Sequence, residues 1–263
     1  MHIDFSDVFA AMREAGRAIM DIYRQDFEVE WKGENDPVTQ ADMEAHWILM
    51  DALQSYGYPV LSEEGQDDKA RFESECFWLV DPLDGTGDFI RRTDEFCVMV
   101  ALMEHGEPVF GAIYLPVEDT LYHAWKGEGA FVSRNKEQEE RISVSKVADP
   151  KQAHALVSRT HKTKDMDALI SAIGTEKITP TGSNGIKAVR VAKGQGDFFI
   201  NPTDKMHEWD IAAPQIIIEE AGGKVTGAHG EKLVYNKREP RALHGELASN
   251  GVLHKAILSA IST

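Results

Sequence analysis

The stretch FWLVDPLDGTGDF, residues Phe77–Phe89, decides the fold and the chemistry of this chain. Its apolar start, Phe77–Val80, is typical of a buried strand, and the following proline and Gly85 end that strand. Asp81 and Asp84 therefore lie at the strand's exit, and the next helical turn opens after Gly85. Two carboxylates this close repel each other unless a cation lies between them or one is protonated. Because free N–H groups after Gly85 can bind an anion, we expect a hard cation and a phosphate side by side.

Two other acidic templates fail at this stretch. An EF-hand loop beginning at Asp81 requires acids at positions 83 and 85 and a glutamate at 92, but the chain has Leu83, Gly85 and Arg92. A haloacid-type phosphatase that forms an aspartyl-phosphate requires its second aspartate at position 83. An isolated pair of acids would be interpreted as a plain acidic turn, so the acids elsewhere in the chain decide.

Three further acids lie at the ends of predicted elements. Thr39 and Asp42 have the spacing of a helix capping box ahead of an apolar stripe. Glu63 follows a strand that begins at Val60, and Asp210 opens a helix. Each has a plain structural explanation, namely a cap for the two aspartates and a solvated turn for the glutamate.

Taken together, five acids stand at element ends, where sites are commonly built. They are Asp42, Glu63, Asp81, Asp84 and Asp210. No His or Cys cluster competes with them, which disfavours zinc. Oxygen ligands alone favour Mg²⁺, which binds a few carboxylates and keeps waters for a substrate phosphate.

Composition narrows the function further. The chain has 263 residues, 42% hydrophobic content and a formal net charge of −16. Such a charge argues against binding a nucleic acid polymer, whereas a small anionic substrate is allowed because bound cations invert the local field. No apolar run is long enough for an integral membrane segment, and early acids argue against a signal peptide. Cys76 and Cys97 are expected to be free thiols in a cytoplasmic protein.

The chain divides into two halves of different texture. Residues 1–150 indicate helices followed by a mainly antiparallel sheet, with most of the acids, and residues 151–263 alternate strands and helices, as in an α/β half that carries Asp210. The predicted helices cover 5–24, 165–173, 186–192, 210–221 and 252–261. Residues 33–37 are predicted as a loop, 67–75 as an exposed mobile segment and 134–141 as a charged surface loop.

Several motifs together resemble the inositol monophosphatase superfamily over nearly the whole chain. They are DPVT at 36–39 with Asp42, SEE at 62–64, DPLDGT at 81–86, WDIAA at 209–213 and EAGG at 220–223. Within it, DGTGDFIRR at 84–92 followed by Glu95-Phe96, and SRTH at 158–161, resemble the CysQ branch, the 3'(2'),5'-bisphosphate nucleotidases. Gly87-Asp88 departs from the Lys-Glu that is usual in this branch.

The resemblance implies a fold and a set of roles. The fold is α/β (α+β), a layered αβαβα sandwich of the inositol monophosphatase and fructose-1,6-bisphosphatase type. Two to three Mg²⁺ ions would bind. The first would be held by Glu63, Asp81, the Leu83 carbonyl and Thr86, the second by Asp81, Asp84 and Asp210, and a third, looser ion by Glu63. Asp42 and Thr86 would orient or deprotonate the attacking water, and the N–H groups of Gly85 and Thr86 would bind phosphate oxygens.

The residues expected to touch the rest of the substrate come mainly from the second half. Gly182 and Ser183 form either a second anion or hydroxyl site or a simple helix cap. Arg159 and His161 would meet a second phosphate or a ribose, unless they lie in a plain surface loop. Lys205 and His207, in the loop before Asp210, are further candidates for contact with the substrate.

The leading expectation is therefore a Mg²⁺-dependent, lithium-sensitive phosphatase. It would hydrolyse the 3'(2')-phosphate of adenosine 3'(2'),5'-bisphosphate or its sulfated relative. The alternatives are an inositol monophosphatase or another sugar phosphatase, and an inactive metal-binding regulatory protein. We expect a monomer or a homodimer.

Overall fold

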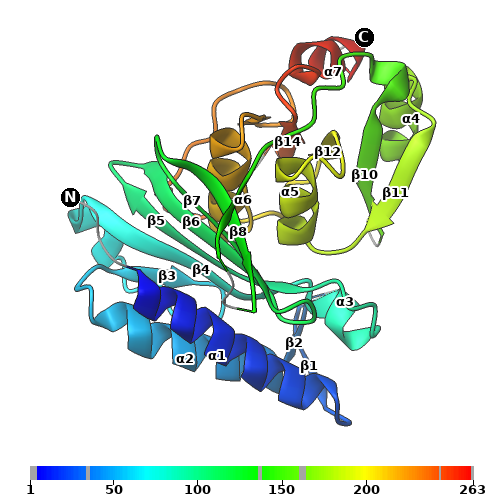
Figure 1. Cartoon of the computed structure of the whole chain (residues 1–263). Coiled ribbons are helices and arrows are strands. Elements are labelled where there is room, and N and C mark those ends of the chain that lie inside the picture. The colour runs from blue at the N-terminus through cyan, green and yellow to red at the C-terminus, as the bar shows by residue number, and fades with distance from the viewer. Residues whose placement is uncertain (1–4, 34–35, 136–137, 160–163, 243, 262–263) are drawn as a thin grey trace.

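A seven-stranded sheet carries most of the first half in the computed structural model, which describes residues 5–33, 36–135, 138–159, 164–242 and 244–261 (Figure 1). Its strands lie in chain order: β3 (Val60–Ser62), β4 (Cys76–Asp84), β5 (Cys97–Glu104), β6 (Glu107–Leu115), β7 (Thr120–Trp125), β8 (Gly129–Arg134) and β9 (Glu140–Ile142). All neighbours are antiparallel except β3 and β4. His105 and Gly106, both with positive φ, join β5 to β6, as a tight hairpin turn requires.

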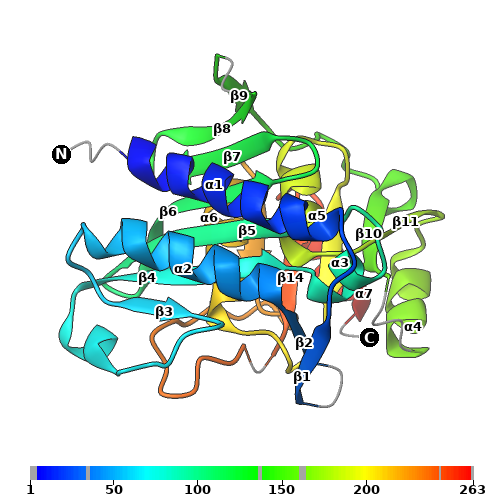
Figure 2. The same ribbon diagram turned by 90° about the horizontal axis from the view of Figure 1, so that it is seen from below.

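Two helices cover one face of this sheet, α1 (Ser6–Tyr23) and α2 (Gln40–Gln54) (Figure 2). Alternate residues of the strands face them, for example Trp78, Val80 and Val100. The intervening residues, such as Leu79 and Met99, face α5 (Asn184–Ala192) and α6 (Glu208–Glu220). Burial on both faces explains why these strands are continuous apolar runs rather than alternating ones.

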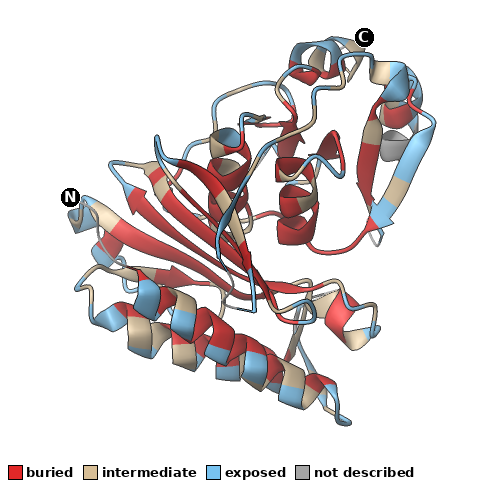
Figure 3. Ribbon diagram, viewed as in Figure 1, coloured by how far each residue is buried: buried red, intermediate tan, exposed pale blue. Residues whose placement is uncertain are grey.

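A second sheet of five strands lies on the far side of α5 and α6. Its order is β11 (Lys177–Thr181), β10 (His154–Ser158), β12 (Phe198–Asn201), β14 (Glu246–Ser249) and β13 (Lys224–Thr226). Phe199 points to α5 and α6, whereas Phe198 points to the outer helices α4 (Lys164–Ile173) and α7 (His254–Ile261). The layers are thus helix, sheet, helix, sheet, helix, and the expected αβαβα sandwich is confirmed. In Figure 3 most of α5 and α6 has the colour of buried residues.

Three segments differ from the sequence prediction. The predicted loop 33–37 belongs largely to a hairpin of β1 (Val29–Gly33) and β2 (Asp36–Thr39), which pair only with each other and are too short to show a period. The segment 67–75 was wrongly predicted to be exposed throughout. It contains a 3₁₀ turn, Ala70–Glu73, and Arg71 is 1% exposed, bonded to Asp67 and to the loop at Asn236. The predicted surface loop 134–141 ends in β9.

Another 3₁₀ turn, Pro150–Gln152, precedes β10. Both cysteines are free thiols, as predicted, with Cys97 buried and Cys76 partly buried. Within the described ranges, none of the helices combines the length and the apolar character that crossing a membrane requires.

Candidate active site

A bulge in β4 turns Asp81 and Asp84 to the same face of the seven-stranded sheet. Asp81 pairs with Met99 of β5 and Asp84 with Cys97, so three steps along β4 match two along β5. Residues three apart in a regular strand point to opposite faces, but the extra residue of a bulge restores the same side. The proline between the two acids suits a bulge because it has no N–H for the ladder. Leu83 is left on the opposite face, buried against the α1 and α2 side.

Gly85 then allows the chain to turn into α3 (Thr86–Ile90). Its φ is +96°, and a Cβ at this position would lie 2.9 Å from the Glu95 carbonyl oxygen and 3.2 Å from the Ser183 Cβ. Both the left-handed backbone and the close approach require glycine.

Asp84 connects the two halves of the chain. Its Oδ2 accepts hydrogen bonds from Ser183 Oγ at 2.5 Å and from the Gly185 N–H at 2.7 Å, and the Cys97 Sγ lies 3.6 Å away. Ser183 is also the N-cap of α5, since its Oγ accepts from the Ile186 N–H at 3.1 Å. The start of α5 is therefore fastened to a site carboxylate.

Glu63 and Asp210 approach the same space from two other elements. Glu63 follows β3, and its N–H donates to the Val80 carbonyl beside Asp81 at 3.1 Å. Asp210 occupies the third position of α6, where its Oδ2 accepts from the His207 N–H at 2.7 Å in a capping box. The helix thus begins two residues before Asp210, not at it as predicted. Capping and a position in the site are compatible, because the cap fixes the carboxylate.

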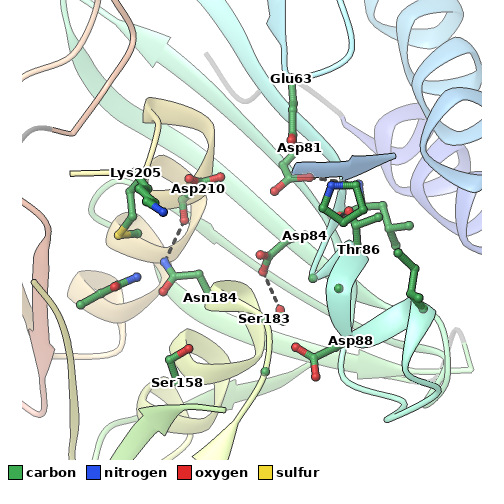
Figure 4. A pocket seen from close by; sticks show the side chains of 18 of the residues that line it. Glu63, Asp81, Asp84, Thr86, Asp88, Ser158, Ser183, Asn184, Lys205 and Asp210 are labelled. Atoms are coloured by element: carbon green, nitrogen blue, oxygen red, sulfur yellow. Dashed lines mark hydrogen bonds between the residues drawn. The ribbon is translucent and has the colours of Figure 1, made fainter. Parts of the chain in front are cut away.

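The four carboxylates of Glu63, Asp81, Asp84 and Asp210 line one pocket of about 650 Å³. Figure 4 shows the three aspartates turned toward a common space below Glu63. The pocket lies between the β1–β2 hairpin, the β4–α3 turn, the start of α5 and the loop before α6. The structure thus brings four of the five predicted acids to one pocket, and Asp42 is not among those that line it.

Their mutual repulsion is strong. Burial, followed by the carboxylates of Glu63, Asp84 and Asp210, raises the pKa of Asp81 well above its usual value. Burial and Glu63 likewise raise the pKa of Asp210, and burial raises that of Asp84 against its hydrogen bonds. A site that places several carboxylates in one buried pocket fits a divalent cation, which removes this repulsion.

The carboxylates line the pocket but their oxygens are not gathered around one common position. In the described part of the chain, no three His, Cys, Asp or Glu side chains are close enough together to hold a metal ion. The donor set consists of oxygens, which fits Mg²⁺.

Thr86 and Asp42 form a hydrogen-bonded pair at the edge of the pocket. Thr86 Oγ1 lies 2.9 Å from Asp42 Oδ1 and 3.2 Å from the Leu83 carbonyl oxygen. Asp42 is 2% exposed, and its Oδ2 accepts from the N–H and the Oγ1 of Thr39 at 2.8 and 2.7 Å. The predicted capping box is confirmed. Asp42 therefore stands behind Thr86, which itself lines the pocket.

Only some of the residues predicted to contact the rest of the substrate line the pocket. Ser183 and Gly182 line the pocket, but the Gly182 N–H already donates to Glu95 Oε2 at 2.6 Å. Arg159 pairs with the same carboxylate oxygen at 2.6 Å and with Asp88 at 3.7 Å, and does not line the pocket. His161 lies outside the described residues.

Of the two candidate residues in the loop before α6, only one lines the pocket. Lys205 lines the pocket. His207 instead stacks on Trp209, with ring centroids 4.6 Å apart.

Sequence reasoning missed a group of buried polar residues next to the acids, namely Asn184, Lys187 and Glu246. Lys187 of α5 lines the pocket at 4% exposure, and burial lowers its pKa while Glu246, Asp84 and Asp210 oppose that shift. Asn184 Nδ2 donates to Glu246 Oε2 at 2.9 Å and to the Asp210 carbonyl at 3.0 Å. Burial raises the pKa of Glu246 to about 7. A lysine between Ile186 and Ala188, two apolar residues of α5, was the signal available in the sequence.

Comparison with known proteins agrees with this geometry. The family model described as the inositol monophosphatase family matches residues 4–263. The chain belongs to the inositol monophosphatase family. It is a phosphatase, an enzyme that hydrolyses phosphoric monoesters.

Relatives from two branches of this family resemble the chain. The chain is 36% identical over 237 residues to the 3'(2'),5'-bisphosphate nucleotidase CysQ of Escherichia coli (strain K12), covering 86% of this chain and 92% of that protein. It is 31% identical over 254 residues to the inositol-1-monophosphatase of Bacillus subtilis (strain 168), covering 94% and 91%. The crystal structure of CysQ from Bacteroides thetaiotaomicron superposes with a TM-score of 0.78 at 32% identity, covering 93% and 96%.

Proposed function

We propose that this phosphatase removes the 3'(2')-phosphate of adenosine 3'(2'),5'-bisphosphate, or of its sulfated relative, with the help of Mg²⁺. The observation that carries the proposal is the meeting of Glu63, Asp81, Asp84 and Asp210, drawn from both halves, on one pocket. Similarity to CysQ supports the choice of substrate.

Two to three Mg²⁺ ions would be held by these four carboxylates, together with the Leu83 carbonyl and Thr86. When bound, such ions lower the pKa of water and neutralise charge on a phosphoryl group. The buried Lys187 lines the same pocket beside the acids and would attract the same phosphoryl group.

Thr86 and Asp42 would handle the proton of the attacking water. Thr86 Oγ1 donates to Asp42 Oδ1, so its lone pairs are free to accept from a water in the pocket. As the water oxygen bonds to phosphorus, its proton passes to Thr86 Oγ1 and the threonine proton passes to Asp42. The leaving oxygen of the nucleotide takes its proton from solvent.

A bisphosphate suits the cations on the pocket wall. Lys205 and Arg91, which pairs with Asp88 at 3.4 Å, both line it and would meet the phosphate that is not hydrolysed. Arg159, which is paired with Glu95 and Asp88, is a weaker candidate than the sequence suggested.

Hydrolysis of inositol monophosphate is the second candidate, because similarity to the Bacillus subtilis inositol-1-monophosphatase covers more of the chain. Phosphate release from adenosine 3',5'-bisphosphate, inositol 1-phosphate and glycerol 2-phosphate, measured with Mg²⁺ and then with Li⁺ added, separates the two. We expect the nucleotide to have the highest kcat/KM and Li⁺ to inhibit. Comparable rates on inositol phosphate with negligible rates on the nucleotide would reject the first proposal. The Asp81→Asn variant controls for contaminating phosphatases.

A further inference from the structure

The pocket wall contains one large side chain that the phosphate chemistry does not use. Trp31, in the middle of β1, lines the pocket and is 64% exposed. It is the only aromatic residue among the described residues that line this pocket. Its partner across the hairpin, Pro37 of β2, lines the pocket as well.

The hairpin is tied to the reaction centre by a short connection. β2 ends at Thr39, whose N–H and Oγ1 both bond to Asp42, and Asp42 in turn holds Thr86. β2 also packs against α3, and Ile90 and Arg91 at the end of α3 line the same pocket. The hairpin that carries the indole is thereby connected to Asp42 and Thr86, and the indole lines the same pocket as the acids.

The pocket is divided by chemistry. The carboxylates and Lys187 line this pocket and suit a phosphate and its cations. Trp31 offers a flat apolar face, which no phosphate needs. A nucleobase does need one, because base–aromatic stacking is a main source of affinity wherever bases are bound outside a duplex.

We propose that Trp31 stacks on the adenine of the substrate and so selects nucleotides over base-free phosphate esters. This inference rests on the proposed function, because it assumes a nucleotide with its scissile phosphate at the acids. A pocket of about 650 Å³ is within the usual range for a ligand of this size.

Trp47 provides a matched control. It is 62% exposed, nearly the same as Trp31, but it lies on α2 in a groove formed with α1, away from the pocket. Replacing either tryptophan removes an exposed indole, so a general effect of such a loss would appear in both variants.

The test compares Trp31→Ala, Trp31→Phe and Trp47→Ala by kcat and KM on adenosine 3',5'-bisphosphate and on glycerol 2-phosphate. We expect Trp31→Ala to raise KM for the nucleotide by about tenfold or more, from the usual strength of base stacking. The kcat for the nucleotide and both constants for glycerol 2-phosphate should change by less than about twofold. Trp31→Phe should recover most of the loss, and Trp47→Ala should match the wild type.

A second readout is direct. AMP should quench tryptophan fluorescence of the wild type and of Trp47→Ala, and the quenching should be largely lost in Trp31→Phe. Equal changes in KM on both substrates would assign Trp31 a role in holding the hairpin and overturn the inference. A wild type that prefers the nucleotide, with that preference unchanged in Trp31→Ala, would also overturn it while leaving the proposed function intact. A wild type without any preference for the nucleotide would reject the proposed function, and the inference with it.

Discussion

Asp84→Asn separates the chemical role of the pocket carboxylates from their structural role. Asp84 Oδ2 accepts two short hydrogen bonds, from Ser183 Oγ and from the Gly185 N–H, and asparagine retains an oxygen that accepts both. A hydrogen bond to a charged group contributes about 1.5–3 kcal/mol and a neutral one about 0.5–1.5 kcal/mol. Weakening two such bonds therefore costs about 2–3 kcal/mol. Removing a buried charge close to Asp81 acts in the opposite direction, so the net loss is smaller.

The fold should consequently survive while activity is lost. At about 2–4 °C per kcal/mol for a protein of about this size, Tm should fall by less than about 10 °C. Changing a group that only supports a metal ligand costs about 10–100-fold, so removing the ligand itself should lower kcat/KM by at least about 100-fold. Mg²⁺ at 100 times its Kd stabilises a protein by about 2.7 kcal/mol. The rise in Tm that corresponds to this stabilisation by Mg²⁺ should appear in the wild type and be largely absent from Asp84→Asn.

Ser183→Ala is the matched control. It removes the same hydrogen bond between the two halves and the cap of α5, at a cost of about 0.5–2 kcal/mol, but keeps all four carboxylates. We expect it to retain the Mg²⁺-dependent rise in Tm and more activity than Asp84→Asn. If Asp84→Asn loses its circular dichroism signal, or keeps the full Mg²⁺ response, Asp84 is a structural residue and the assignment is wrong.

Three further outcomes follow from the geometry. Thr86→Val should lower kcat by about 100-fold or more, the usual contribution of acid–base catalysis, whereas Thr86→Ser should recover it, and equal activity of the two variants would exclude the proton path through Thr86. Arg71→Met should destabilise the protein by about 2–4 kcal/mol in urea, because it removes the hydrogen bonds of a buried guanidinium to Asp67 and to Asn236, with kcat unchanged; a loss below about 1 kcal/mol would contradict the reasoning. Burial lowers the pKa of His254, between Ser249 and Thr226, to about 4 from 6.5. Between pH 4 and pH 6.5 the native state therefore binds fewer protons than the unfolded chain. The free energy of unfolding consequently decreases as the pH falls from 6.5 toward 4, by up to about 3 kcal/mol. Urea unfolding of the wild type and of His254→Gln at pH 7 and pH 5 checks this, and equal pH dependence in both would refute it.

The chemistry of the pocket was predictable from the sequence because it depends on residue types at element ends. The stretch 77–86 indicates a strand that is followed by two acids and a turn. Asp42, Glu63 and Asp210 each lie beside a local signal of a helix or strand end. Spacing alone could not give the face to which Asp84 points. A regular strand would have turned it away from Asp81, and only the pairing with β5 shows the bulge.

The parts that were missed depend on partners distant in the chain. Arg159 resembled a substrate contact until Glu95, 64 residues earlier, was seen to pair with it. The role of Lys187, in helix α5, depends on Asp84 and Glu246, which belong to the distant strands β4 and β14. The β1–β2 hairpin escaped prediction because an exposed two-stranded ribbon has no buried face to impose a period.

Crystals grown with Mn²⁺ in place of Mg²⁺, and with AMP or phosphate present, test the central proposal most directly by anomalous diffraction. We expect peaks inside the pocket, with oxygens of Asp81 and of at least two among Glu63, Asp84 and Asp210 at about 2.0–2.3 Å from the ions, close to the distances usual for such small cations. No peak in the pocket, at Mn²⁺ concentrations that support phosphate release by the same protein, would contradict the proposal that these carboxylates hold the catalytic ions.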